Sequence, residues 1–246
     1  MKPTLLILIS IALVSCGKKH NDLITNNIKG NVSQITENVY EVSEKFGDLQ
    51  KGKLKTTNVI KYNDDGNVTE YRRISMPDSI SGKEDNFETY QYKDGNRISS
   101  INGKSHKVGI RYNYDNDKLI ETNTYNDNGS LSIKTKFKYN DDGLIAEADE
   151  YASTGSLNGR VINKYTDSKQ IKEQDKITVD NKVESVTWYN YDAKDMLTGY
   201  KYKSGTYTAN YLLKFSLFEK DNWLKLVNYY NSKPETLVER KIEYYN

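Results

Sequence analysis

The sequence has few of the residues that cross-link a chain, bind metal or interrupt a strand. Of its 246 residues, one is cysteine, two are histidine and three are proline. A single cysteine excludes an intrachain disulfide, and the two histidines lack the neighbouring ligands of the usual zinc patterns. Three prolines leave long stretches in which strands can run uninterrupted. Neither sign of charge is in excess, with 36 basic and 34 acidic side chains, so nothing in the charge balance favours nucleic acid as a partner.

Long apolar runs are also missing, except for one at the start of the chain. The run LLILISIALV, from Leu5 to Val14, follows Lys2 and is too short to cross a bilayer as a helix. Its length and its basic flank are typical of a secretory signal peptide. We therefore expect residues 1–15 to be removed.

The residues that follow this run resemble the bacterial lipoprotein signal. Leu13, Val14 and Ser15 precede Cys16, as a small residue precedes the invariant cysteine of that signal. The resemblance implies cleavage before Cys16, acylation of the new N-terminus and attachment to a membrane through the lipid. The polar residues 16–30 are then expected to form a lipid-anchored tether.

Two features after Cys16 bear on the destination of the protein. Gly17 stands where many lipoproteins of the inner membrane carry Asp, which favours the outer membrane. The segment GKKHND at 17–22 lacks the acidic run that marks surface export in some bacterial groups. We expect an outer-membrane lipoprotein of the cell envelope, facing the periplasm rather than the cell surface.

One short phrase recurs along the rest of the chain. An aromatic residue precedes a polar turn at intervals of 25 to 27 residues, at Tyr114, Tyr139, Tyr165, Tyr191 and Phe218. A second series interleaves with the first, which gives a half-period of about 13 residues, enough for one strand and one turn. From residue 31 onward there is room for roughly sixteen such strands.

The turns between these segments carry residues that β-hairpins favour, because Asn and Asp tolerate positive φ and Gly adopts it freely. The turn dipeptides are Asp65-Gly66, Asp94-Gly95, Asn128-Gly129 and Asp142-Gly143. Between turns, side chains alternate in character along the chain, which indicates strands. The prediction is a single all-β domain over 31–246, an extended and twisted antiparallel meander of tandem hairpins, forming an open sheet or a solenoid.

The start of this domain allows two interpretations. Val32, Ile35, Val39, Val42 and Phe46 follow the three-four spacing of an amphipathic helix. The same segment is rich in β-branched residues, which favour a pleated surface. We expect a strand here.

Four copies of the phrase resemble the YD repeats of the RHS class and, more loosely, MORN-type variants. They are YNDDGN at 62–67, YNDNGSL at 125–131, YNDDGL at 139–144 and YDAKDML at 191–197. Asn63, Asn126 and Asn140 stand where the class often has Asp, and Asp195 replaces the turn Gly. Similar repeats occur in small bacterial lipoproteins. The resemblance implies an architecture more than an activity.

No group of residues predicts catalysis, a cofactor or a metal site. A calcium loop with Gly66 or Gly143 at its sixth position would begin with Lys61 or Lys138, and lysine is not a calcium ligand. His20 and His106 stand outside any nucleophile motif. We expect no enzyme activity, no cofactor and no metal.

Two aromatic clusters supply candidate binding residues. They are Trp188, Tyr189 and Tyr191 in TWYNY, and Trp223, Tyr229 and Tyr230 in NWLKLVNYY. Exposed rings would stack on sugars or on a partner protein, whereas rings paired across strands would hold the sheet together. Strand alternation places Trp188 on the opposite face from Tyr189 and Tyr191.

The function predicted from these features is a non-enzymatic, lipid-anchored envelope protein whose β-repeat scaffold binds an unknown envelope protein. Two alternatives stay open. One is a glycan-binding surface lipoprotein that uses exposed Trp and Tyr. The other is an immunity protein against an envelope toxin, which only the RHS-like resemblance suggests.

Overall fold

The computed structural model describes residues 21–76 and 82–246, which form one short helix and sixteen strands. The expected signal peptide, Leu13, Val14, Ser15, Cys16 and His20 lie outside the described residues. The elements are α1 (Asp22–Thr25), β1 (Val32–Lys45), β2 (Asp48–Tyr62), β3 (Val68–Ser75), β4 (Glu84–Lys93), β5 (Asn96–Asn102), β6 (Val108–Asp115), β7 (Lys118–Tyr125), β8 (Leu131–Tyr139), β9 (Ile145–Ala152), β10 (Leu157–Tyr165), β11 (Ile171–Thr178), β12 (Val183–Tyr191), β13 (Leu197–Ser204), β14 (Tyr207–Glu219), β15 (Asn222–Tyr230) and β16 (Lys233–Tyr244).

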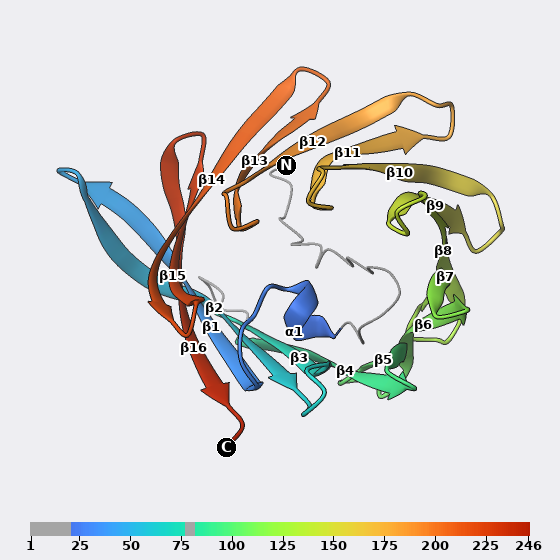
Figure 1. The fold of residues 1–246 in the computed structure, drawn as a ribbon, viewed down its shortest axis with the longest axis horizontal. Helices are drawn as coiled ribbons and strands as arrows, with labels where there is room; N and C mark the ends of the chain where they lie inside the picture. The colour runs from blue at the N-terminus through green and yellow to red at the C-terminus, as the bar shows by residue number, and fades with distance from the viewer. Residues whose placement is uncertain (1–20, 77–81) are drawn as a thin grey trace.

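The strands form one closed antiparallel barrel. Each strand pairs with its neighbours in the sequence, and β1 also pairs with β16, with Ile35 opposite Ile242 and Val39 opposite Val238. Figure 1 shows the resulting ring of strands around an interior. The prediction of an extended, open or solenoid-like sheet is therefore wrong. The right-handed twist between neighbouring strands accumulates over a long meander, and closure removes both exposed edges.

The repeated phrase forms one kind of turn. At Asn140 the side-chain oxygen accepts a hydrogen bond from the Leu144 N–H at 2.9 Å, and the Gly143 N–H donates to the Asn140 carbonyl at 2.9 Å. Gly143 has a φ of 75°, in the left-handed region that glycine adopts without a Cβ clash. Asp195 and Lys169 hold the same position with φ of 57° and 67°. The phrase therefore encodes a reversal of the chain, with or without glycine.

The tyrosine before each turn connects neighbouring hairpins. The hydroxyl of Tyr139 donates to the carbonyl of Leu119 at 2.7 Å, and that of Tyr165 donates to the carbonyl of Ile145 at 2.7 Å. Tyr191 repeats the contact with the carbonyl of Ile171 at 2.9 Å, again 20 residues earlier in the chain. Each repeat of about 26 residues is therefore one hairpin, joined to the preceding hairpin by a tyrosine hydrogen bond.

A small apolar core lies at one place inside the ring. Leu23 of α1 packs with Val32, Ile35, Tyr62 and Val68, all buried. Figure 1 shows α1 within the ring of strands, so residues 21–30, expected as part of a tether, lie against the barrel. A barrel of sixteen strands is too wide for side chains to fill. Most of the inner wall is accordingly only half-buried.

Candidate binding site in the barrel lumen

The contacts of α1 identify which face of the sheet points inward. Tyr92 and Arg97 both hydrogen-bond the carboxylate of Asp22, which lies inside the ring. Residues paired across neighbouring strands face the same side of a sheet. The inward face can therefore be followed from strand to strand through the paired residues Tyr90, Ser100, Ile110, Thr124 and Ile133. Side chains in register with these residues line the lumen, and their neighbours along each strand face outward.

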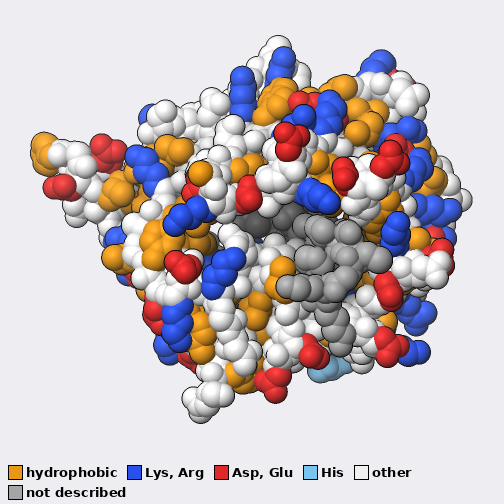
Figure 2. All heavy atoms as spheres, viewed as in Figure 1, with side chains coloured by type: hydrophobic (Ala, Val, Ile, Leu, Met, Phe, Trp, Pro, Cys, Tyr) orange, Lys and Arg blue, Asp and Glu red, His pale blue; other side chains and the backbone are white. Residues whose placement is uncertain are grey.

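The outward face of β7 to β11 carries paired charges along the strands. Near the middle of the strands, Glu121 lies 3.5 Å from Lys134 and Asp149 lies 3.9 Å from Arg160. Lys138 lies 2.5 Å from Glu147 and 2.9 Å from Asp149, and Lys164 pairs with Glu173 and Asp175. Figure 2 shows Lys and Arg interspersed with Asp and Glu around the periphery of the barrel. Barrels that cross a membrane present an apolar band at this height. The outward face of β7 to β11 has charge pairs in its place.

Asp149 is the most buried carboxylate in this outer ladder, with 6% of the residue exposed. Burial by itself would raise the pKa of its carboxyl group. Hydrogen bonding to Lys138 and the nearby Arg160 outweigh burial, so the pKa of Asp149 lies below its ordinary value. The carboxylate therefore stays charged and paired at neutral pH.

Four tyrosines form a continuous row on the inward face of β12 to β15. The ring centroids are 6.1 Å apart from Tyr189 to Tyr200, 4.4 Å from Tyr200 to Tyr211, and 5.4 Å from Tyr211 to Tyr230. The register places them directly opposite one another across the strands. The hydroxyls of Tyr230 and Tyr207 lie 2.8 Å apart at the end of the row. We call Tyr189, Tyr200, Tyr211 and Tyr230 the tyrosine row.

The tyrosine row offers both ring surface and polar atoms to the lumen. The Tyr200 hydroxyl is buried and has no hydrogen-bond partner among the described residues. Burial raises the pKa of Tyr200 well above its usual range, so the phenol is neutral and able to donate. The hydrogen bond with Tyr230 is the main cause that raises the pKa of Tyr207 to about 12. A flat molecule with hydrogen-bonding edges matches such a wall.

The structure divides the predicted aromatic residues between the two faces of the sheet. Trp188 faces outward, where its indole N–H donates to Glu173 at 2.7 Å. Tyr229 also faces outward, with the Lys214 ammonium 4.6 Å from its ring centroid. Trp223 lies under the Arg240 guanidinium at 3.4 Å from its ring centroid. Tyr189, Tyr191 and Tyr230 face the lumen, and Trp223 contacts Phe215 and Arg240, which lie on the same inward face. Trp188 and Tyr229 face outward, so the six do not form one surface.

Sequence reasoning missed Tyr200, Tyr207 and Tyr211. A signal for them was available, because Tyr200 and Tyr211 are equally far from the two-residue turn Gly205-Thr206 and so must pair across the hairpin. The same rule pairs Ser204 with Tyr207. Counting outward from each turn would have found most of the row.

The remaining sequence-predicted positions lie in turns at the two ends of the barrel. Gly66, Gly95, Gly129 and Gly143 have positive φ, and Asp94 has it as well. Asp65, Asn128 and Asp142 occupy the same turns. Within the described ranges 21–76 and 82–246, no group of three or more His, Cys, Asp or Glu side chains is placed to hold a metal ion.

Comparison with protein-family models gives no match, and comparison with curated proteins gives none. In the part of the chain that the structure describes, no helix has the length and apolar character needed to cross a membrane.

Similarity appears among solved structures. A porin-like protein from Bacteroides uniformis is 12% identical to this chain and superposes with a TM-score of 0.60, covering 86% of this chain and 96% of its own. A second porin-like protein, from Bacteroides vulgatus, is 13% identical with a TM-score of 0.46, covering 88% and 99%. A Photorhabdus luminescens Tc holotoxin pore has a TM-score of only 0.32 over 75% of this chain. Of these three similarities, the first extends over most of both chains with a TM-score above 0.5, and it concerns the fold.

These findings correct the family and functional predictions. The assignment to RHS-like YD or MORN-type repeats is wrong, because the shared fold is that of a porin-like barrel. The interaction scaffold, the glycan-binding surface and the immunity protein are wrong as well. The scaffold and the glycan-binding surface assumed repeats displayed on an extended sheet, whereas closure turns one face of the sheet into a lumen. The immunity protein depended on the RHS-like resemblance alone, which the porin-like fold overturns. Residues 21–76 and 82–246 fold as a closed sixteen-stranded barrel that is similar to a porin-like protein.

Proposed function

We propose that this protein is a binding barrel that takes a small, flat, largely apolar molecule with hydrogen-bonding edges into its lumen. The tyrosine row holds the molecule through its rings, and the hydroxyls of Tyr207 and Tyr230 at the end of the row bond a polar edge. Binding without catalysis is part of the proposal. The barrel wall lies in water, and the acylated Cys16 holds the protein at the periplasmic face of the outer membrane.

The observation that carries the proposal is the inward position of the tyrosine row. Four rings at centroid distances of 4.4 to 6.1 Å form one aromatic surface across four strands. Cross-strand tyrosines stabilise any sheet, but here they face a lumen too wide to be packed by side chains alone. A ring surface that borders open space favours stacking with a guest molecule.

The outward charges support a wall in water rather than a channel through lipid. A Lys or Arg on the lipid-facing side of a barrel at the bilayer midplane costs about 2–4 kcal/mol. The outward pairs Glu121–Lys134 and Asp149–Arg160 lie near the middle of their strands, and the pairs made by Lys138 and Lys164 lie nearer the strand ends. The porin-like name of the similar structure and the lipoprotein-like signal both support a location at the outer membrane.

The binding proposal is tested by titrating the folded protein with N-phenyl-1-naphthylamine, a neutral aromatic probe whose fluorescence rises in an apolar site. We expect saturable binding to the unaltered protein, and binding weakened about 3- to 10-fold by Tyr211→Ala, from the usual strength of aromatic pairs. Tyr229→Ala is the matched control, because it removes an outward ring from the same pair of strands. Equal affinities for the two variants, or no saturable binding, would reject the lumen as the site.

The position of the wall is tested by a Cys16→Ala variant expressed in bacteria. With acylation blocked, we expect the protein in the aqueous fraction without detergent. A wall that spans the bilayer would keep the same variant in the membrane until detergent extracts it.

A further inference from the structure

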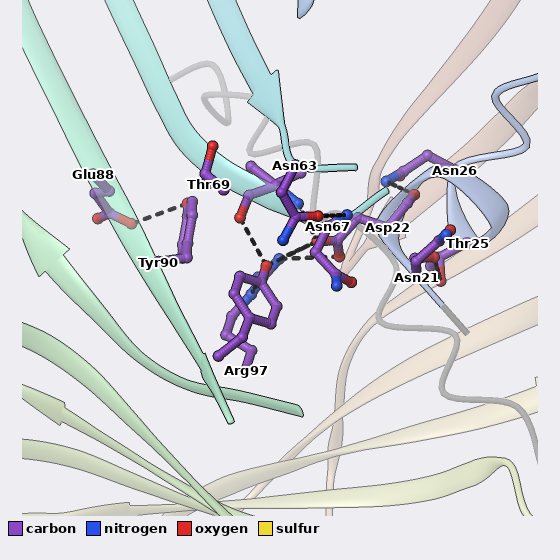
Figure 3. A network of polar contacts seen from close by, with 12 residues as sticks. Asn21, Asp22, Thr25, Asn26, Asn63, Asn67, Thr69, Glu88, Tyr90 and Arg97 are labelled. Atoms are coloured by element: carbon purple, nitrogen blue, oxygen red, sulfur yellow. Dashed lines mark hydrogen bonds and ion pairs between the residues drawn. The ribbon is translucent and has the colours of Figure 1, made fainter. Parts of the chain in front are cut away.

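Four hydrogen bonds converge on the carboxylate of Asp22. Arg97 donates twice through Nη2, at 3.0 and 2.9 Å, and the Val68 N–H donates at 2.7 Å. The Tyr92 hydroxyl lies 2.9 Å from the carboxylate and 2.8 Å from the Val68 carbonyl, and it shares its one proton between them. Figure 3 shows Asp22 and Arg97 at the centre of this polar network. Donors that meet from a guanidinium, a phenol and a backbone amide form a site specific for a carboxylate. We call Val68, Tyr92 and Arg97 the carboxylate pocket.

All the donors belong to the barrel, whereas the acceptor does not. Val68, Tyr92 and Arg97 lie on β3, β4 and β5, and Asp22 lies on α1, before the first strand. Only 19% of the Arg97 side chain is exposed, and its guanidinium lies 4.4 Å from the Tyr90 ring centroid. A guanidinium held in this way needs an anion, whatever molecule supplies it.

An apolar pocket adjoins the carboxylate pocket. Leu23, the residue after Asp22, is 5% exposed and packs on Val32, Ile35 and Tyr62. The barrel thus accommodates an aliphatic group directly beside a carboxylate. A short aliphatic carboxylic acid has both groups, a carboxylate and an alkyl chain next to it.

The occupant is a small element. Helix α1 has four residues, a single turn, which is far below the length at which a helix is stable by itself. Beyond Asp22 and Leu23, it is held by the Leu23 N–H to the Gly66 carbonyl at 3.1 Å and by the Asn21 amide to the Asp65 carbonyl at 2.6 Å. Ile28 also packs against the apolar core, so this contact must break as well when the segment leaves. Lys29, which follows the segment, stays held by two hydrogen bonds of 2.8 Å between its backbone and the Asn222 side chain.

We propose that the carboxylate pocket and its apolar neighbour form a binding site for a free aliphatic carboxylate, which α1 occupies as an internal ligand. A free acid with a short alkyl chain replaces Asp22 with its carboxylate and Leu23 with its chain. The segment 21–28 then leaves the lumen. This site is separate from the tyrosine row and does not depend on it.

Hexanoate is the probe for this site, with hexanol as the neutral probe of equal chain length. The variant Asp22→Gly empties the carboxylate pocket and leaves Arg97 without its anion. We expect its melting temperature to fall and hexanoate to restore it, with an affinity at least tenfold higher than for the unaltered protein, because no internal carboxylate competes. Hexanol should restore little.

Asp85→Gly is the matched control, because Asp85 forms a two-bond pair with Arg72 on the outward face. Loss of that exposed pair should not be rescued by hexanoate. The double variant Asp22→Gly, Arg97→Gln should lose the response. Equal rescue by hexanol, or equal rescue of Asp85→Gly, would overturn the proposal.

If Asp22→Gly does not fold, hydrogen exchange on the unaltered protein tests whether a free carboxylate displaces α1. Saturating hexanoate should increase amide exchange over residues 21–28, whereas hexanol should not. Unchanged exchange over this segment would mean that α1 is a fixed part of the barrel. Because the readout is confined to α1, it is independent of the naphthylamine titration of the tyrosine row.

Discussion

At the scale of single residues, tyrosine both stabilises the barrel and lines its lumen. Tyr139, Tyr165 and Tyr191 each place a ring on the inner wall and a hydroxyl on the carbonyl of an earlier hairpin. A large ring with a polar tip serves a wall that has no thick aliphatic core behind it. The same residue type forms the tyrosine row on β12 to β15, where the ring surface borders the lumen.

Removing one of these hydroxyls should have a measurable cost. Tyr139→Phe leaves the carbonyl of the buried Leu119 without its phenol donor, so the free energy of unfolding should fall by about 1–2 kcal/mol. Tyr151→Phe is the control, because that ring faces outward near Lys136 and should change stability by less than about 0.5 kcal/mol. Urea unfolding followed by circular dichroism measures both. An equal decrease in the free energy of unfolding for the two variants would show that the Tyr139 hydrogen bond does not stabilise the barrel.

At the scale of elements, the turns have two roles that the phrase itself does not distinguish. Gly66 and Gly129 both have positive φ, of 78° and 84°. A Cβ at Gly129 would meet nothing within 4 Å, whereas a Cβ at Gly66 would lie 2.5 Å from the Asn21 amide nitrogen and 3.0 Å from a Leu23 methyl group. One turn only reverses the chain, and the other also holds α1.

Alanine at the two positions separates these roles. Gly129→Ala should lower the free energy of unfolding by about 1 kcal/mol, the cost of a side chain at positive φ. Gly66→Ala should cost more, because the new methyl group also displaces α1, and it should increase hydrogen exchange over residues 21–28. Calorimetry and exchange on both variants provide the test. Similar exchange of α1 in the two would contradict a docking role for the β2–β3 turn.

At the scale of the whole molecule, buried tyrosines make the barrel sensitive to alkali. Burial raises the pKa of Tyr114, Tyr139 and Tyr191 to about 12, whereas tyrosine in an unfolded chain titrates near pH 10. Between these values the unfolded chain has lost protons that the folded barrel still holds. Stability should therefore be steady up to about pH 9 and fall from about pH 10 to 12.

Urea unfolding at a series of pH values measures this decline, and absorbance at 295 nm reports tyrosinate directly. The double variant Tyr139→Phe, Tyr191→Phe removes two of the titrating groups and should flatten the fall in stability. An unchanged slope would assign the alkaline decline to lysines such as Lys138, whose pKa its hydrogen bond to Glu147 raises.

The amino-acid sequence by itself determined the strands, their approximate number and their turns. These depend on local rules: side chains that alternate with period two, Asn or Asp before Gly at reversals, and a tyrosine at each repeat. It also favoured a strand over a helix for residues 32–45, as β1 shows. All of this is encoded within about one hairpin, so one sequence suffices.

Only the tertiary structure decided closure, the direction of each face and the partner of Asp22. Closure depends on the pairing of β1 with β16, almost 200 residues away in the chain, and on twist summed over every strand. Alternation sorts Trp188 and Tyr189 onto opposite faces but cannot say which face becomes the lumen. Arg97 meets Asp22 across 75 residues, and no local pattern joins them. Local chemistry fixes elements, whereas the lumen and its sites exist only after distant strands meet.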